Sequence, residues 1–385
     1  MSGAGIREQL QKLFIKVRDG YFFTFPEPHE LQVRTGHTLE SRVRVSMGEG
    51  ERWAQTFFTS LNGERPLGEL ITVVPADYQD HVLSVVVALW RENLLVSSEQ
   101  PFAQGEALEG DWLRRLMGPR FPVRDFYEEA LRDAAVLVLG AGVLGSRVAA
   151  SLVQLGTGTV TVADSQAVTE LDRMSAPLYV GAEVGEARRD ALLRPLKQLS
   201  RASAVDAVEQ PETEESEAWR ELVQKHTMVI VAEDSYRPAL LQRVNETAVA
   251  QGVRWSMLLL DGWDVYVGPT FFPGQTGCYA CWEQQRKRLM AAPDSYERYV
   301  NALIRKTQEP LFHGSPQFAD VAAGMLTSDL LNLLGILPQR VEMQSSLTLG
   351  RQLHFDMRTF EAKLTNLIKE PRCATCQPKQ GGGAL

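Results

Sequence analysis

Short hydrophobic runs separated by turn residues mark the first hundred positions of the chain. Three runs have the length and the β-branched or aromatic content of strands, at residues 21–25, 31–35 and 41–46. The spacing then becomes helical, with Trp53, Phe57 and Leu61 four residues apart and an amphipathic helix over about 77–93. Three strands followed by helices predict a small, winged-helix-like α+β domain.

From residue 134 onward, longer apolar runs alternate with helical patterns. The run 134–140 predicts a buried strand, residues 141–156 a helix and 157–164 a second strand, which together form a βαβ unit. Further strands are predicted at 227–234, at 253–261 and, in antiparallel orientation, at 263–272. We therefore expect an α/β, Rossmann-like domain with a mostly parallel sheet. The expected limits are 1–98 for the first domain, 99–125 for a linker, 126–378 for the second domain and 379–385 for a disordered tail.

Composition and charge narrow the function. The chain is 44% hydrophobic and 23% charged, and no apolar run approaches the roughly 20 residues that a membrane span needs. Its first residues lack the apolar segment of a signal peptide, so we expect a cytoplasmic protein. The formal net charge of −8 argues against nucleic acid as a partner, because duplex binding relies on Lys and Arg.

All four cysteines fall in two CxxC pairs, Cys278 with Cys281 and Cys373 with Cys376. Two such pairs supply the four thiolates of a tetrahedral structural zinc site, which would join two distant segments. The alternatives are unliganded thiols or a redox-active CxxC.

A glycine pattern follows the first strand of the βαβ unit. Gly140, Gly142 and Gly145 form a GxGxxG sequence between a strand and a helix, which is the setting of a phosphate-binding loop. Asp164, at the end of the next strand, is placed to bind ribose hydroxyls. The pattern indicates an adenine nucleotide or dinucleotide site. Alternatively, the glycines serve only close helix-strand packing in a scaffold without a ligand.

The stretch after Asp164 resembles the ThiF/MoeB, ubiquitin-activating-enzyme-like superfamily. The resemblance rests on Glu170-Leu171-Asp172-Arg173, on Arg188, and on Asp234 with Arg237 and Asn245. It implies that Arg173 and Arg188 bind the triphosphate of ATP, and that Asp234 holds Mg²⁺ and poises an acyl adenylate. Two departures weaken this expectation: the family's NLxRQ sequence reads ELDRM here, and Arg188 stands where the family has lysine.

Two segments narrow the resemblance further. The sequences GPTFFPGQTGCYAC (268–281) and RTFEAKLTNLIKEPRCATC (358–376) resemble those of proteins that bind the precursor peptides of thiazole/oxazole-modified microcins. They are also similar to the microcin C adenylating enzymes. Both groups carry an N-terminal winged-helix clamp, the RiPP recognition element, which matches the element order predicted for residues 1–98.

The resemblance implies how the first domain would work. A leader peptide would add a strand beside Arg42, Val43, Arg44 and Val45, whose alternation places the two arginines on one side. An ordinary solvent-facing strand is the alternative. The leading hypothesis is a component, homodimeric by resemblance, that presents a ribosomal precursor peptide to a separate, ATP-dependent YcaO-type cyclodehydratase.

Three other functions compete with this one. An adenylating enzyme would use ATP and Mg²⁺ to form a peptidyl-AMP, and a generic activator of a sulfur-carrier protein would not need a leader clamp. A dehydrogenase fits less well, because hydride transfer has no use for Arg173 with Asp234 or for the two CxxC pairs.

Overall fold

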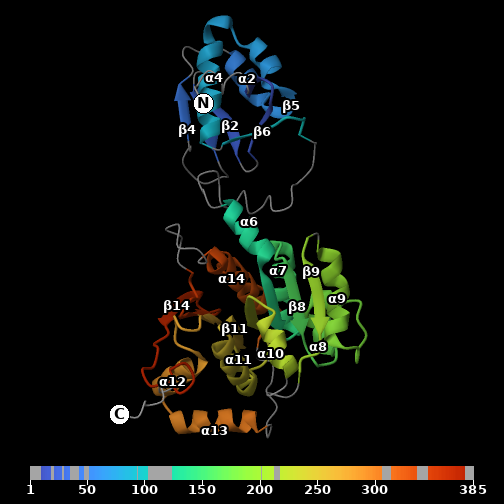
Figure 1. Ribbon diagram of the computed structural model, residues 1–385, viewed down its shortest axis with the longest axis vertical. Helices are drawn as coiled ribbons and strands as arrows, with labels where there is room; N and C mark the ends of the chain where they lie inside the picture. Colours follow the sequence, from blue (N-terminus) through green and yellow to red (C-terminus); the bar gives the residue numbers. More distant parts are fainter. Residues whose placement is uncertain are drawn as a thin grey trace, which may run out of the picture. The chain divides into compact units, whose positions relative to one another are not determined.

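The computed structural model describes residues 10–18, 21–27, 30–34, 43–46, 52–92, 94–102, 124–200, 202–211, 217–305, 314–335 and 346–377. These residues form two compact units, Met1–Asp125 and Phe126–Leu385, which Figure 1 colours from blue to red along the chain. Among the described residues no helix is long and apolar enough to cross a membrane. Most of the predicted linker, the predicted tail and Arg42 lie outside the described residues.

The first unit contains two three-stranded antiparallel sheets, in the orders β5-β1-β6 and β2-β3-β4. Its strands are β1 (Phe14–Val17), β2 (Phe22–Glu27), β3 (Glu30–Arg34), β4 (Val43–Ser46), β5 (Asn62–Pro66) and β6 (Leu95–Ser98). Its helices are α2 (Arg52–Thr59), α3 (Leu67–Leu70), the 3-10 turn η1 (Ile71–Val73) and α4 (Ala76–Arg91). The core is built from the apolar faces of α2 and α4, where Phe57, Phe58, Val82 and Val86 are fully buried.

The predicted order of three strands followed by helices is incomplete. The expected runs 21–25, 31–35 and 41–46 correspond to β2, β3 and β4, but β1 precedes them and β5 and β6 lie among and after the helices. β5 escaped prediction because its sequence, Asn62-Gly63-Glu64-Arg65-Pro66, is polar. It is a strand because β1, whose Ile15 is fully buried, pairs with it.

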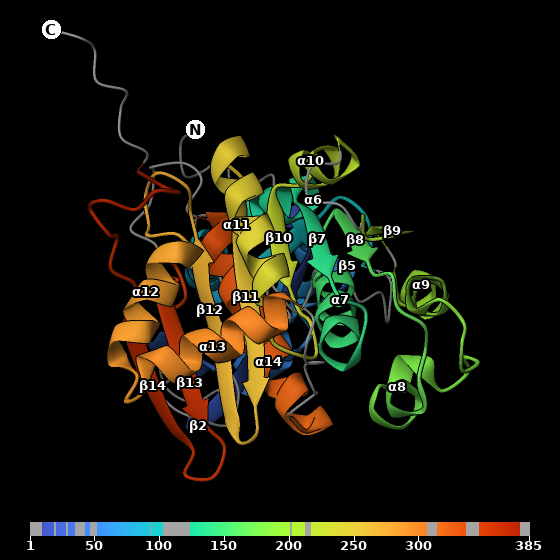
Figure 2. The same cartoon turned by 90° about the horizontal axis from the view of Figure 1, so that it is seen from below.

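The second unit is an α/β domain around one eight-stranded sheet, ordered β14-β13-β12-β11-β10-β7-β8-β9 (Figure 2). The five strands from β9 to β11 are parallel, and β12, β13 and β14 are antiparallel. The strands are β7 (Ala135–Leu139), β8 (Thr159–Ala163), β9 (Ala204–Val208), β10 (Met228–Val231), β11 (Arg254–Asp261), β12 (Asp264–Phe271), β13 (Arg351–Asp356) and β14 (Glu361–Asn366). The expected α/β class and the mostly parallel sheet are therefore confirmed.

Helices of the second unit form two groups. α7 packs with α9 and α14, and α11 packs with α10, α12 and α13. The bounds are α6 (Arg124–Asp133), α7 (Val143–Leu155), α8 (Glu170–Ser175), η2 (Pro177–Tyr179), α9 (Arg188–Leu199), α10 (Glu217–Gln224), α11 (Pro238–Gln251), α12 (Tyr279–Leu289), α13 (Pro293–Ile304) and α14 (Pro316–Gly335). The central strands read as continuous apolar runs because helices cover both faces of a parallel sheet.

Candidate functional site

The glycine loop lies where β7 ends and α7 begins. β10 runs parallel to β7, with Val231 opposite Leu139, so the residues that follow the two strands come together. Gly140 has a φ of 99°, a left-handed conformation that favours glycine, and Gly142 caps the N-terminus of α7. The loop therefore meets the segment that contains Asp234, as expected at the carboxyl edge of a parallel sheet.

Each loop glycine is required by contacts within the protein. A Cβ atom on Gly140 would lie 2.8 Å from the carbonyl oxygen of Ala232, and one on Gly145 would lie 1.9 Å from that of Gly140. A Cβ atom on Gly142 would lie 1.9 Å from Oδ2 of Asp234. The glycines are thus explained by packing alone, whether or not the loop binds a nucleotide.

Two carboxylates accept the N–H groups of this loop. The backbone N–H of Ala141 donates to Asp164 Oδ2 at 2.7 Å. At the start of α7, the N–H of Val143 donates to Asp234 Oδ2 at 2.9 Å and that of Leu144 to Oδ1 at 2.8 Å. A helix N-terminus attracts anions through such free N–H groups, and here Asp234 supplies the anion.

The two arginines expected to bind a triphosphate lie in different environments. Arg188 is buried, pairs with Asp172 Oδ2 at 2.9 Å and donates from Nη1 to Gln166 Oε1 at 2.7 Å. Burial lowers the pKa of Arg188, but the carboxylates of Asp172 and Asp164 outweigh it and raise the pKa above its ordinary value. Arg173 is exposed on the surface of α8 and pairs with Glu170 Oε1 at 3.3 Å, so the structure brings Arg188 but not Arg173 to the loop's carboxylates.

Sequence reasoning missed three members of this site. Asp172 closes a capping box with Thr169 and is fully buried, a role that the Thr-x-x-Asp spacing signals. Tyr179 donates from its hydroxyl to the carbonyl oxygen of Ala141, which ties η2 to the glycine loop. Glu233 is buried next to Asp234 and pairs with Arg237 at 3.2 Å. The roles of Tyr179 and Glu233 cannot be predicted from the sequence, because their partners lie on other segments that only the fold brings near.

Burial raises the pKa of both acids that follow β10. For Asp234 the hydrogen bonds from Leu144 and Val143 oppose this effect. For Glu233 burial raises the pKa to about 7, against the lowering effect of Arg237. Asp164, Asp172, Glu233 and Asp234 face the cations Arg188 and Arg237, so acids outnumber these bases.

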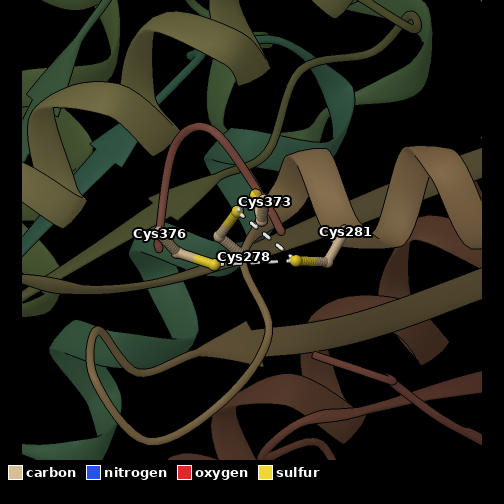
Figure 3. A group of neighbouring side chains, drawn as sticks. All are labelled: Cys278, Cys281, Cys373 and Cys376. Carbon is tan, nitrogen blue, oxygen red and sulfur yellow. Dashed lines mark hydrogen bonds between the residues drawn. The ribbon is translucent and has the colours of Figure 1, made fainter. Parts of the chain in front are cut away.

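The four cysteines converge in a second place, at the start of α12 (Figure 3). Cys278 caps the N-terminus of α12 and Cys281 lies in its first turn, whereas Cys373 and Cys376 come from the C-terminal segment. Their Sγ atoms all lie within 4.8 Å of one another, and Cys278–Cys281, Cys278–Cys373 and Cys281–Cys376 are 3.9, 3.6 and 3.6 Å apart. A tetrahedral zinc ion with bonds of about 2.3 Å sets sulfurs about 3.8 Å apart, so the cluster could bind zinc.

Local contacts support the cluster. The pKa of Cys281 is lowered to about 5 because it accepts hydrogen bonds from the thiol of Cys278 and the backbone N–H of Glu370. Asn245 of α11 accepts the N–H of Tyr279 at 2.8 Å and so fixes the start of α12. Asn245, which was singled out with Asp234 and Arg237, therefore anchors the cysteine helix and does not contact the glycine loop's N–H groups.

The expected peptide-binding strand forms in the first unit. β4 includes Val43, Arg44 and Val45, and its register sets Leu31 opposite Val45. β4 comes last in the order β2-β3-β4, so only one of its two backbone edges pairs with a described strand. Among the described strands, β4 therefore has one backbone edge that no other strand pairs with, and peptide binding at that edge stays a prediction.

The second unit thus combines a Rossmann-type loop and sheet with a four-cysteine cluster, and comparison with known proteins identifies the family. The model of the ThiF family matches residues 113–375, so the chain belongs to the ThiF family. Among curated proteins, a sulfur carrier protein adenylyltransferase of Thermus thermophilus is 27% identical over 253 residues, 65% of this chain and 84% of its own. The sulfur carrier protein ThiS adenylyltransferase of Bacillus subtilis is 28% identical over 162 residues, 42% of this chain and 47% of its own.

Solved structures resemble the whole chain. Escherichia coli MccB with ATP matches with a TM-score of 0.62 at 15% identity, over 94% of this chain and 99% of MccB. MccB with MccA-N7isoASN matches with a TM-score of 0.63 at 16% identity over the same shares. PaaA matches with a TM-score of 0.61 at 15% identity, over 91% of this chain and all of that chain. The predicted resemblance to the ThiF/MoeB superfamily and to the microcin C enzyme is confirmed, and these structures establish the fold.

Proposed function

We propose that the chain is a ThiF-family protein that binds the leader of a ribosomal precursor peptide and presents it to a separate, ATP-dependent YcaO-type cyclodehydratase. The observation that carries this proposal is the state of the glycine loop. Its N–H groups at Ala141, Val143 and Leu144 already donate to Asp164 and Asp234. A triphosphate would have to displace the Asp234 carboxylate from the N-terminus of α7, so the ATP chemistry belongs to a partner.

The arginines support the same proposal. Arg188 is held by Asp172 inside the protein, and breaking a buried pair of this kind costs several kcal/mol. Arg173 is exposed beside Glu170. Arg188 is thus committed to Asp172, and Arg173 lies on the surface of α8, so neither guanidinium is positioned at the charge that develops on a leaving pyrophosphate, which is where an adenylating site needs its cations.

Peptide binding would use the backbone edge of β4. An added strand gains main-chain hydrogen bonds that do not depend on sequence, and pockets for alternate side chains then select the leader. Two solved structures share this fold along nearly the whole chain and hold a second component: the microcin C7 biosynthetic enzyme MccB in complex with N-formylated MccA, and MccB with MccA-N7isoASN. They support binding of a partner by this fold, and the choice of the β4 edge rests on its position at the end of the sheet.

One observation favours a second function, that of an adenylating enzyme acting on the bound peptide. Asp164 and Asp234 lie on the glycine loop together, and a Mg²⁺ ion arriving with ATP could draw Asp234 off the α7 amides. MccB with ATP is among the structures that share the fold, and both curated relatives are described as adenylyltransferases.

Calorimetric titration of the full-length, zinc-loaded protein with magnesium ATP decides between the two functions. The presenting function predicts no heat of binding from the wild-type protein. Binding at micromolar strength that disappears in Asp234→Ala would overturn it in favour of adenylation, and a peptidyl-AMP would then be sought by mass spectrometry. Circular dichroism and cooperative thermal unfolding of Asp234→Ala serve as the control for folding, with a lower stability expected because the carboxylate that accepts two N–H groups of α7 is removed.

The proposal includes two further components. The four-cysteine cluster would hold a structural zinc ion that staples the C-terminal segment to α12. The protein would act as a homodimer, which light scattering on the zinc-loaded chain measures directly. A monomeric mass at micromolar concentration would remove the dimer from the proposal and leave peptide binding to be tested separately.

A further inference from the structure

A pocket of about 430 Å³, a volume typical of small-ligand sites, lies at the antiparallel end of the sheet. Residues of α12 and of strands β12, β13 and β14 line it. None of the glycine-loop residues lines it, and neither do the cysteines. The pocket is therefore separate from both sites already described.

The charges that line this pocket are positive. Arg286 of α12 and Lys363 of β14 are its two full cations, and no Asp or Glu is among its lining residues. Lys363 stands directly opposite His354 in the register of β14 with β13. Asp264, which is not a lining residue, contacts His354 with 2.6 Å between Oδ1 and Nε2, so this carboxylate is already paired with the histidine. The lining thus favours an anion.

Aromatic rings orient Arg286, and Glu283 on the same helix interacts with it electrostatically without forming an ion pair. Its guanidinium lies 5.1 Å from the ring centroid of Trp282, 5.9 Å from that of Tyr236 and 5.6 Å from that of Tyr296. Within the described part of the chain it forms no ion pair, so its N–H groups lack the acceptor that a partly buried arginine usually has. Cation-π contacts orient the group and leave its donors for a ligand.

Aromatic, apolar and uncharged polar side chains form the rest of the wall, and hydrogen bonds fix some of them. Tyr266 stacks on His354 with ring centroids 4.7 Å apart. Trp282 donates from Nε1 to Gln352 Oε1 at 3.3 Å, and Gln352 donates to the carbonyl oxygen of Gly268 at 3.2 Å. Leu289 adds an apolar surface. These contacts form the pocket before any ligand arrives, which reduces the entropy cost of binding.

We infer that this pocket binds a carboxylate carried on an aromatic or aliphatic group. Arg286 and Lys363 would hold the carboxylate, and Tyr266 and Trp282 would contact the apolar part. A polyphosphate fits less well, because it needs more donors than one guanidinium and one exposed ammonium and gains nothing from aromatic walls. The ligand could be a free carboxylic acid or the C-terminal residue of a peptide, which present the same chemistry.

Three small probes test the inference on the full-length, zinc-loaded protein by calorimetry. Phenylacetate should bind, whereas phenylacetamide, which has the same shape without the charge, should bind at least roughly tenfold more weakly. Inorganic phosphate should also bind at least roughly tenfold more weakly, because it lacks the apolar part. Equal binding of phenylacetate and phenylacetamide, or of phenylacetate and phosphate, or no binding of phenylacetate, would overturn the inference.

Three variants assign the effect to the pocket. Arg286→Gln and Lys363→Gln should each weaken phenylacetate binding, by roughly tenfold and roughly threefold. Arg298→Gln removes the same charge from the exposed face of the neighbouring helix α13, outside the pocket, and should leave binding within about twofold. Because Lys363 is exposed, Lys363→Gln should not disturb the packing, and it still tests the pocket if Arg286→Gln disturbs α12. Equal affinities for the wild-type protein and both pocket variants would contradict the assignment.

A peptide pair separates the two sources of the carboxylate. Acetyl-Gly-Phe with a free C-terminus should bind more tightly than phenylacetate if the pocket takes the end of a peptide chain, and acetyl-Gly-Phe amide should lose that gain. Weaker binding of the peptide acid than of phenylacetate assigns the pocket to a free acid. Neither result depends on ATP, so failure here is distinguishable from failure of the proposed function.

Discussion

The four-cysteine cluster and the glycine loop are both ligand motifs in the sequence, yet the fold treats their polar groups in opposite ways. In the cluster, four sulfurs converge on one point and meet mainly each other (Figure 3). In the loop, the N–H groups of Ala141, Val143 and Leu144 meet two carboxylates of the protein itself. Four sulfur ligands that face one another need a bound cation, whereas the N–H groups of the loop already have hydrogen-bond acceptors within the protein. A motif therefore defines a backbone geometry, and distant side chains decide whether it is available to a ligand.

The largest expected effect comes from removing one sulfur. Cys373→Ser should release zinc and destabilise the second unit by about 5 kcal/mol or more, because the free energy of metal binding is part of the folding free energy. Metal content measured by mass spectrometry and thermal unfolding check this. Ala374→Ser places a hydroxyl at an exposed neighbouring position and should change neither quantity. Full zinc content in Cys373→Ser would mean that the four thiolates do not form the site.

The next effect tests whether Asp234 closes the loop. Gly142→Ala places a Cβ atom 1.9 Å from Asp234 Oδ2 and should break its hydrogen bonds to α7, at a cost of about 4 kcal/mol. In an Asp234→Ala background the clash is gone, and the same substitution should cost less than about 1 kcal/mol. Urea unfolding of the four proteins of this cycle measures the coupling. Additive costs would show that Asp234 does not occupy the loop.

The positions of the glycine loop and of the cysteine cluster could be predicted from the sequence, but the contacts of the two arginines could not. Periodicity and spacing located β7, α7, β8 and β10 because a buried parallel strand is a continuous apolar run, and the CxxC spacing located the cluster because thiolates have few other reasons to be paired. The resemblance placed Arg173 and Arg188 together. The structure separates them, because the capping box of Thr169 and Asp172 draws Arg188 inward, while Arg173 comes out beside Glu170.

Glu233 shows a further limit of sequence reasoning. Its position after β10 is readable, but its burial depends on the packing of the loop against Ala232 and on Arg237. The same holds for the pocket at α12, which collects residues from β12, β13, β14 and α12. No local pattern signals a side chain whose neighbours come from four elements.

A pH measurement isolates Glu233. Its pKa is raised from 4.5 to about 7, so between these values the folded state binds the proton more tightly than the unfolded state does. The free energy of unfolding should therefore fall as pH rises from about 4.5 to 7, by on the order of 3 kcal/mol at about 1.4 kcal/mol per pKa unit, and level off above 7. Glu233→Gln should remove this part of the decline in urea unfolding. Glu246→Gln, an exposed change on α11, should keep it, and parallel curves for all three proteins would contradict the burial of a protonated Glu233.

The smallest expected effect on the free energy of unfolding is that of Arg173, which lies on the surface outside the glycine loop. Arg173→Ala should change the free energy of unfolding by no more than about 0.5 kcal/mol, because an exposed i,i+3 pair with Glu170 is worth little in water. A double-mutant cycle with Glu170→Ala should give a coupling energy in the same range. Magnesium ATP titrated into Arg173→Ala sharpens the comparison: if the wild-type protein binds ATP and this stable variant does not, Arg173 reaches the nucleotide from the surface. The glycine loop would then be an open site like the cysteine cluster, with Asp234 as a lid on it that ATP displaces.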